Sequence, residues 1–261
     1  MESITSRVND KIKYAVKLRD SASFRRSENR FFIEGARLCA DALQSGICID
    51  MLFATQKAFD RYSEYTAPIL SACGCCYTVS EEVAQKLSDT KSTQGVFCVC
   101  KMLDKNANIG KIKYNGKYVA LEEISNPANF GAVCRTAEAV GLDGIIVSGG
   151  CDVYSPKAQR AAMGALFRLS VTECDDFCEL LGSLKENGMR VLASVPDENA
   201  ANITGVDMTG GVVLIIGNEG NGISERVKAV SGEPVTIPMK GRAESLNASA
   251  AASIMMWEMM R

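Results

Sequence analysis

The 261-residue chain contains no histidine, and this absence excludes several kinds of chemistry. Ser-His and Cys-His nucleophile pairs cannot form, and the most common general base in enzymes is missing. Catalytic zinc sites of the usual types also rely on histidine, so we expect no metal. Any reaction must therefore use carboxylates, arginine, lysine, hydroxyl groups or the backbone.

The chain also lacks any apolar run of about eighteen residues, so we expect no membrane span. Its first residues, 1–20, carry charges throughout and contain no apolar core of a secretory signal. The eleven cysteines are then expected to be reduced thiols in the cytoplasm, and their spacings match no zinc signature.

Charge is distributed unevenly, although the net charge is only −2. Residues 1–30 hold eight basic and four acidic side chains, so this segment carries +4 on an otherwise acidic chain. A basic segment of this kind predicts contact with a polyanion such as RNA, with Arg25, Arg26 and Arg30 as candidate contacts. A solvated helix face is equally consistent with the pattern.

Strands and helices alternate in two blocks, which predicts an α/β protein of two domains. In the first block we expect strands over 30–35, 49–54, 76–79 and 95–100, and helices over 8–18, 36–44, 62–72 and 81–87. Residues 25–26 are expected in a serine-rich connection before the first of these strands. Residues 101–117 are polar and form the predicted linker. In the second block we expect strands over 118–122, 144–148, 168–172, 190–194, 212–216 and 235–237, and helices over 132–140, 156–163 and 177–187. The predicted domains are 1–105 and 106–261, the second with a mostly parallel sheet.

Three segments of the second block are candidate site loops because each follows a predicted buried strand. The apolar strand 212–216 is followed by 217–222, which contains three glycines and Glu219. The strand 235–237 precedes a helix start that contains Ser245 and Asn247. The third candidate is the loop 126–135, in which Arg135 is expected on the first turns of the next helix. An alternative reading of Arg135 is a surface ion pair with Glu138, one turn further along that helix. Taken alone, a loop rich in glycine and asparagine is also an ordinary turn.

Three sequence motifs resemble those of a known family. Residues 129–137, then 216–223, then 237–239 with 244–249 resemble, in this order, the motifs of the SpoU/TrmH family. Members of this family are S-adenosylmethionine-dependent RNA ribose 2′-O-methyltransferases of the SPOUT superfamily. The segment of about 25–100 is similar to the small substrate-binding domain of many members, which resembles an RNA-binding ribosomal protein fold.

The resemblance implies a SPOUT methyltransferase domain with a trefoil knot near its carboxyl end, and a homodimer with the site near the subunit interface. It implies that the backbone around four residues cradles S-adenosylmethionine: Gly217, Ile237, Met239 and Leu246. It places five residues in the reaction centre: Asn129, Arg135, Glu219, Ser245 and Asn247. We expect the dimer contact in the tail, where Met255, Met256, Trp257, Met259 and Met260 are too apolar for a solvated helix.

The roles of the two charged residues of the reaction centre, Arg135 and Glu219, stay open. Family proposals give Arg135 a central role, sometimes as the base. A guanidinium is a poor base, so we expect it to bind a phosphate and stabilise the developing alkoxide. Glu219 either accepts the proton of the ribose hydroxyl or only orients Arg135 and the loop. A cysteine nucleophile at Cys134 does not fit the motif.

The expected function is methylation of a ribose 2′-hydroxyl in structured RNA, with 23S ribosomal RNA favoured over tRNA. The alternative is a non-catalytic RNA- or ribosome-binding protein that keeps the fold. A Rossmann nucleotide site is excluded because the spacing of Gly217, Gly220 and Gly222 differs from its fingerprint.

Overall fold

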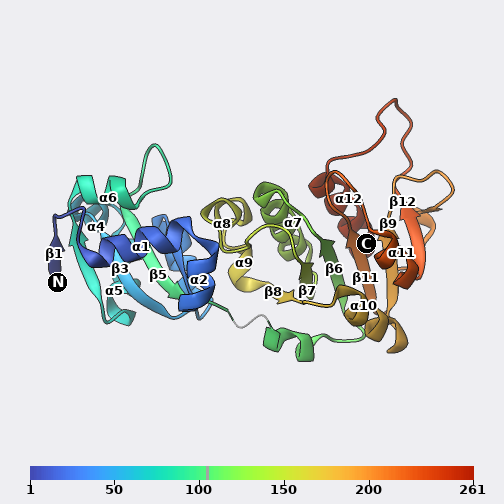
Figure 1. Cartoon of the computed structure of the whole chain (residues 1–261), viewed down its shortest axis with the longest axis horizontal. Helices are drawn as coiled ribbons and strands as arrows, with labels where there is room; N and C mark the ends of the chain where they lie inside the picture. Colours follow the sequence, from blue (N-terminus) through green and yellow to red (C-terminus); the bar gives the residue numbers. More distant parts are fainter. Residues whose placement is uncertain (104–105) are drawn as a thin grey trace. The chain divides into compact units, whose positions relative to one another are not determined.

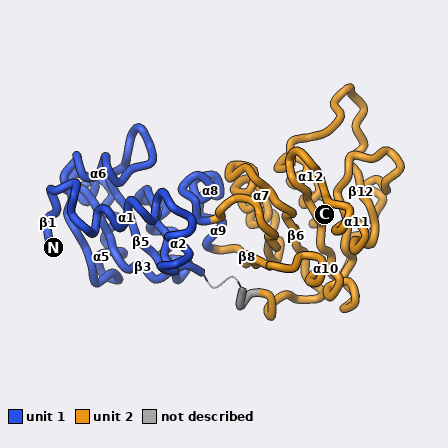
Figure 2. Tube along the Cα trace, in the orientation of Figure 1, with its two compact units in different colours: residues 1–103, 154–167 blue, residues 104–153, 168–261 orange. Residues whose placement is uncertain are grey.

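The computed structural model describes residues 1–103 and 106–261. They form two compact units, one of residues 1–103 and 154–167 and the other of residues 106–153 and 168–261 (Figure 2). The predicted boundary between residues 105 and 106 adjoins positions 104–105, which lie outside the described residues. Segment 154–167 falls within the predicted second domain but belongs to the first unit. None of the described helices is long and apolar enough to cross a membrane.

The first unit is built on a five-stranded sheet of β1 (Glu2–Ile4), β2 (Arg30–Glu34), β3 (Ile49–Ala54), β4 (Cys76–Val79) and β5 (Val96–Lys101). The strand order is β1-β4-β3-β5-β2 (Figure 1). β4 pairs in parallel with β1 and β3, whereas β5 pairs antiparallel with β3 and β2. The sheet is therefore mixed.

Helices pack against this sheet: α1 (Asp10–Asp20), α2 (Ala22–Glu28), α3 (Ala36–Gln44), α4 (Gln56–Arg61), α5 (Ser63–Ala72), α6 (Glu81–Leu87), α8 (Pro156–Ala162) and α9 (Ala165–Arg168). α1 and α6 bury Leu18 and Leu87 in one core with Phe32 of the sheet. Segment 154–167 is tied to β2 because Gln159 donates to the carbonyl of Phe32 at 2.9 Å. Burial of these aromatic and aliphatic groups stabilises the unit.

The second unit is built on seven strands: β6 (Lys117–Glu122), β7 (Gly144–Ser148), β8 (Ser170–Glu173), β9 (Arg190–Ser194), β10 (Ala201–Asn202), β11 (Val212–Ile216) and β12 (Glu233–Thr236). Their order is β10-β12-β9-β11-β6-β7-β8, and every neighbouring pair is parallel. β11 lies between β9 and β6, and all five of its residues are buried. This position explains its unbroken apolar sequence and confirms the predicted parallel sheet.

Helices cover both faces of this sheet: α7 (Pro127–Val140), α10 (Phe177–Glu186), α11 (Glu225–Val230) and α12 (Ala248–Met260), with short 3₁₀ helices η1 (Asn106–Lys111) and η2 (Ile203–Gly205). Leu181 of α10 and Val227 of α11 pack on Val213 and Ile215 of β11. α7 and α12 pack against each other, and α12 also contacts β11 and β6 (Figure 1). The carboxyl ends of β9, β11 and β6 therefore lie side by side at one edge.

Two local predictions were wrong. Residues 25–26 were assigned to a connection, but Ser21 caps α2 by accepting a hydrogen bond from the backbone N–H of Phe24 at 3.3 Å. Residues 126–131 were assigned mostly to a loop, but α7 already begins at Pro127, capped by the side chain of Asn126. Proline suits the first helical position because its missing N–H would have no helical partner there. Asn129 and Arg135 consequently lie on one helix.

Candidate active site

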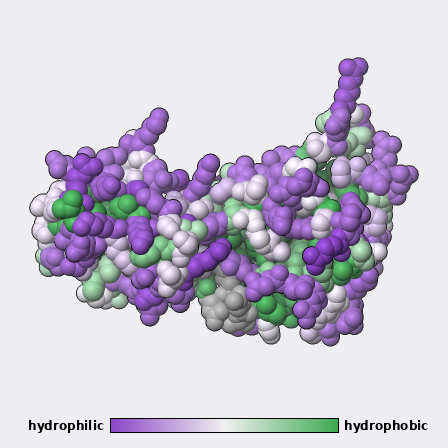
Figure 3. Space-filling model, viewed as in Figure 1, coloured by the Kyte–Doolittle hydropathy of each residue, from purple (hydrophilic) through white to green (hydrophobic). Residues whose placement is uncertain are grey.

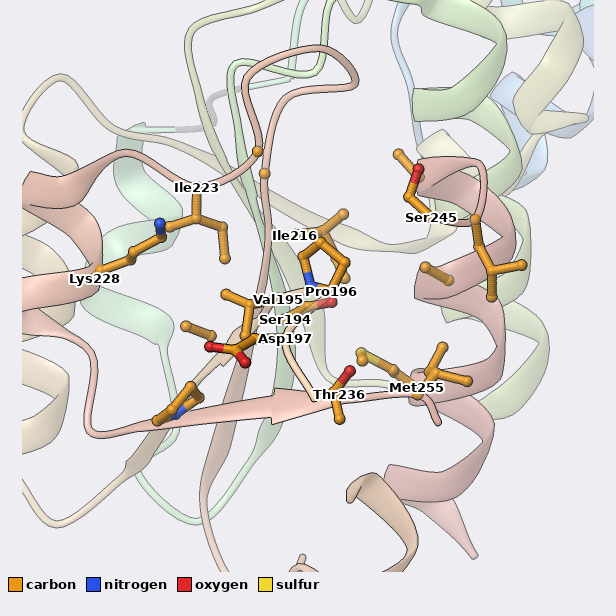
Figure 4. A pocket seen from close by; sticks show the side chains of 18 of the residues that line it. Ser194, Val195, Pro196, Asp197, Ile216, Ile223, Lys228, Thr236, Ser245 and Met255 are labelled. Atoms are coloured by element: carbon orange, nitrogen blue, oxygen red, sulfur yellow. The ribbon is translucent and has the colours of Figure 1, made fainter. Parts of the chain in front are cut away.

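A pocket of about 670 Å³ lies at the carboxyl edge of the parallel sheet. Its walls come from the segments that follow β9, β11 and β12 and from the start of α12. Figure 4 shows Ile223 and Lys228 on one side and Ser245 on the other, with Val195 and Ile216 between them. Open parallel sheets bind their ligands at this edge, so the pocket is the candidate active site.

The loop after β11 is held in a tight conformation by its glycines and Asn218. A Cβ on Gly217 would overlap the backbone of Gly222 and Ile223, so only glycine fits there. Gly222 has a φ of +68°, which other residues rarely adopt. The side-chain oxygen of Asn218 accepts from the N–H groups of Gly220 (2.9 Å) and Asn221 (3.1 Å). Contacts within the loop itself therefore define its conformation.

Glu219 joins this loop to the start of α7. Its carboxylate accepts from the N–H of Ser125 (3.0 Å), the hydroxyl of Ser125 (2.9 Å), the N–H of Asn126 (3.1 Å) and the side-chain amide of Asn129 (2.9 Å). Burial alone would raise its pKa, but the hydrogen bonds from Asn129, Ser125 and Asn126 outweigh it and lower the pKa from 4.5 to about 2. A carboxylate with so low a pKa, and with four donors on it, is a weak proton acceptor at neutral pH.

A second carboxylate holds the far end of the same loop. Glu122, at the end of β6, accepts from the N–H of Ser224 at 2.9 Å and from its hydroxyl at 2.5 Å. The side chain of Asn218 donates to the carbonyl of Glu123 at 2.8 Å. The loop from β11 to α11 is therefore fastened to the end of β6 and the start of α7 at three places.

Asn129 and Asn247 link the start of α7 to the start of α12 through a hydrogen bond. The side chain of Asn247 donates to the side-chain oxygen of Asn129 at 3.2 Å. Its own oxygen accepts from the N–H groups of Ser249 (3.0 Å) and Ala250 (3.3 Å) and so caps α12. The three predicted motifs meet in one chain of hydrogen bonds that runs through Glu219, Asn129 and Asn247.

Arg135 is exposed on α7, beyond this network. Within the described part of the chain, its guanidinium has no hydrogen-bond or ion-pair partner. The alternative reading, an Arg135–Glu138 pair on the helix surface, is wrong because Glu138 pairs with Arg168 at 2.8 Å. The charge of Arg135 is therefore free to act on a ligand from outside the unit.

The predicted cofactor residues Gly217, Ile237, Met239 and Leu246 all line the pocket, as do Glu219 and Ser245. Asn129, Arg135 and Asn247 are not part of its lining. Apolar walls from Ile216 and Met255, beside polar backbone groups of the glycine loop, suit a ligand of mixed polarity and the size of S-adenosylmethionine. The close approach at Gly217 fits binding through backbone groups.

Sequence reasoning missed one wall of the pocket, formed by the last residue of β9 and the segment that follows it, residues 194–197. The signal was present, because 190–194 was predicted as a strand and Asp197 follows it within a few residues. Only the strand order shows that β9 lies next to β11, so the sequence alone did not single this segment out. Among the residues that the structure describes, no group of cysteine, aspartate and glutamate side chains is placed to hold a metal ion.

The three arginines predicted to contact RNA in the first unit differ in how accessible they are to a ligand. Arg25 is only 4% exposed, and its guanidinium donates to the carbonyls of Leu18 and Arg19 at the end of α1. We therefore withdraw Arg25 from the RNA contacts, because a ligand cannot reach it. Arg30 is half-buried and pairs with Asp50, whereas Arg26 is exposed.

The apolar tail is divided between the core and the surface. Met255, Met256 and Met259 are buried within their own unit, so they give no argument for a partner. Ile254 (46% exposed) and Trp257 (64% exposed) remain on the surface of α12. The apolar surface available for a dimer is therefore smaller than the sequence indicated.

Comparison with known proteins finds relatives of both parts of the chain. Residues 116–257 match the SpoU rRNA Methylase family, and residues 9–98 match the MRM3-like substrate binding domain. The chain is 29% identical over 261 residues, 99% of each protein, to the 23S rRNA (guanosine(2553)-2′-O)-methyltransferase RlmP of Bacillus subtilis (strain 168).

Solved structures agree over nearly the whole length. The AdoMet-bound rRNA methyltransferase from Sinorhizobium meliloti has a TM-score of 0.88 and 27% identity, over 99% of this chain and 97% of that one. An RNA 2′-O ribose methyltransferase has a TM-score of 0.82 and 28% identity, over 98% and 97%. These neighbours share the α/β architecture described above.

Proposed function

The chain belongs to the SpoU rRNA Methylase family and is an S-adenosylmethionine-dependent RNA ribose 2′-O-methyltransferase, and we propose that its target lies in 23S ribosomal RNA. The observation that carries the assignment is the pocket at the carboxyl edge of the sheet, which brings together Gly217, Ile237, Met239 and Leu246. The trefoil knot implied by the resemblance stays a prediction.

We propose that the pocket binds S-adenosylmethionine between the glycine loop and the start of α12. The backbone around Gly217 and Met239 would hold its polar groups, and Ile216 and Leu246 would cover its apolar surface. When bound, this cofactor supplies an electrophilic methyl group. The contribution of the chain is to fix the loop in advance and to exclude water from the apolar walls, so that little ordering is left for the binding step.

We infer that Arg135 acts through its charge and that Glu219 is not the proton acceptor. Glu219 is saturated by four donors and ionised, with a pKa of about 2, so it serves to position the loop. Arginine side chains stay protonated in proteins, and the exposed guanidinium of Arg135 has the planar donor geometry that suits an RNA phosphate. It would stabilise the negative charge that develops on the attacking ribose oxygen, while the proton of the hydroxyl passes to solvent water.

The proposed preference for ribosomal RNA over tRNA rests on the family match and on the full-length similarity to a 23S rRNA methyltransferase. A ribosomal RNA substrate also supports a cytoplasmic location. The test is incubation of the protein with labelled S-adenosylmethionine and separated ribosomal RNA and tRNA fractions, followed by mapping of the modified ribose. Label in tRNA alone would contradict the proposed target, and label in neither fraction would contradict the proposed function.

We propose a homodimer whose contact is formed by α12. Ile254 and Trp257 would lie at the centre of this contact, because they are the large exposed apolar side chains of the helix. Burial of Trp257 in a partner would account for its exposure here. Trp257→Ser should convert the dimer to a monomer in sedimentation velocity at micromolar concentration. Val8→Ser, at a 69% exposed valine of the first unit, is the matched control and should leave the dimer intact. A wild-type protein that sediments as a monomer at all concentrations would refute the proposal.

A further inference from the structure

The segment between β12 and α12 forms a long exposed loop beside the pocket. All of its residues 238–246 are exposed. Figure 1 draws it as a tall projection that ends at the start of α12, and Figure 3 shows a hydrophilic projection at the same place. Exposed loops of this kind often carry binding residues.

In the described part of the chain, this 238–246 loop is not held by polar contacts. No backbone or side-chain group from residue 238 to residue 246 forms a hydrogen bond or an ion pair there. Two of its side chains, Lys240 and Arg242, are cations without a carboxylate partner among the described residues. This contrasts with Lys228 and Arg190 of the same unit, which pair with glutamates at 2.7 and 2.5 Å.

Both ends of the loop belong to the wall of the pocket. Met239 lines the pocket at one end, and Ser245 and Leu246 line it at the other. Lys240 directly follows Met239, and Arg242 lies between the two ends, but neither cation is part of the lining. The two cations are therefore carried by an exposed segment whose two ends both line the pocket.

We propose that Lys240 and Arg242 bind phosphates of the RNA next to the ribose that is methylated. The proposal rests on the proposed function, since it names the surface by which this site holds its substrate. Two cations that are unpaired among the described residues, on an exposed polar segment, suit a polyanionic backbone, because phosphate contacts release counterions and do not require an enclosed pocket. The loop contains no large apolar side chain away from the cofactor wall, which argues against a protein partner there.

The experiment measures binding and methylation of unmodified 23S rRNA of Bacillus subtilis, transcribed in vitro, by the full-length protein. The double variant Lys240→Ala/Arg242→Ala should bind this RNA about ten- to thirty-fold more weakly at moderate salt. The slope of log affinity against log salt should fall by about two, one for each lost phosphate contact. The Kd for S-adenosylmethionine should change by less than about two-fold, because neither side chain lines the pocket.

Glu244→Gln is the matched control, since Glu244 is equally exposed on the same loop and lies outside the pocket lining. It removes a negative charge and should leave RNA binding unchanged or tighter. Equal losses in Glu244→Gln and in the double variant would show that loop conformation matters and would overturn the proposal. Unchanged RNA affinity and salt slope in the double variant would also overturn it. Failure of the wild type to methylate any RNA would instead count against the proposed function.

Discussion

Replacing Glu219 by glutamine tests whether this carboxylate positions the loop or accepts the proton. The amide keeps the shape of the side chain but turns one acceptor into a donor. That donor would face the N–H groups of Ser125 and Asn126 or the amide of Asn129, all of which donate to Glu219 in the native protein. The attachment between the glycine loop and α7 should therefore be weakened.

The size of the effect follows from the pKa of Glu219. A fall from 4.5 to about 2 corresponds to at most roughly 3 kcal/mol of interaction with the ionised form. Glu219 is exposed, so solvent screening reduces this to about 1–2 kcal/mol. If that free energy holds the loop for its ligand, Glu219→Gln should raise the Kd for S-adenosylmethionine about five- to thirty-fold.

The assay is calorimetric binding of S-adenosylmethionine, together with single-turnover methylation at saturating cofactor between pH 6 and 9. We expect weaker binding, a rate at saturation within about ten-fold of wild type, and an unchanged shape of the pH profile. Glu123→Gln is the control, because this exposed carboxylate has no side-chain partner among the described residues. Wild-type cofactor affinity combined with a rate loss of a hundred-fold or more would show that Glu219 is the base after all.

The same substitution gives a pH dependence of stability with a defined sign. Because the folded pKa of Glu219 is depressed, its stabilising contribution is complete above about pH 4.5 and is lost as the pH falls through about 2. Wild type should therefore exceed Glu219→Gln in free energy of unfolding at pH 7, and the difference should vanish near pH 2. Urea titrations at pH 7, 4 and 2.5 measure this difference.

Three further predictions use matched substitutions. Gly217→Ala should abolish detectable cofactor binding, since its Cβ would overlap backbone atoms. Gly220→Ala should bind the cofactor normally, because its Cβ would lie 3.6 Å from the nearest atom, the side-chain oxygen of Asn218. Calorimetry of cofactor binding distinguishes the two variants. Arg25→Ala should lower the melting temperature by several degrees through loss of its buried carbonyl contacts, whereas Arg26→Ala should keep wild-type stability and weaken RNA binding a few-fold in filter binding. Arg135→Lys should keep part of the methylation rate and Arg135→Ala should lose several orders of magnitude; equal rates would refute a role for its charge.

Much of the fold could be predicted because its elements are encoded locally. Parallel strands buried on both faces are continuously apolar, and β11 shows this in each of its five residues. Glycines end several helices, as Gly141 does for α7 with a φ of +85°. Segment 154–167 could not be assigned in this way, because contacts of Gln159 and Tyr154 with β2 decide to which unit it belongs. Such contacts leave no periodicity in the sequence.

The residues of the candidate site could be predicted from the sequence, but the hydrogen bonds between them could not. The glycines, Glu219 and the polar helix start at Ser245 could be recognised from their positions after apolar strands. The partners of Glu219 could not, because they depend on the adjacency of β6 and β11, whose sequences are about ninety residues apart. The burial of Arg25 was equally hidden, since an arginine beside Arg26 in a serine-rich stretch resembles any solvated cation.

The hydrogen-bond chain changes how the three motifs should be understood. Glu219 lines the pocket, but Asn129 and Asn247 do not, and each of these asparagines touches the site only through the other residues of the chain. The side-chain amide of Asn129 donates to Glu219, and its oxygen accepts from Asn247. The side-chain oxygen of Asn247 caps α12 by accepting from the N–H of Ser249. Groups committed in this way are poorly placed to exchange protons with a substrate. In this structure the asparagines of the first and third motifs therefore hold the loops in position. Arg135, which has no such partner among the described residues, remains able to act on the reacting oxygen through its charge.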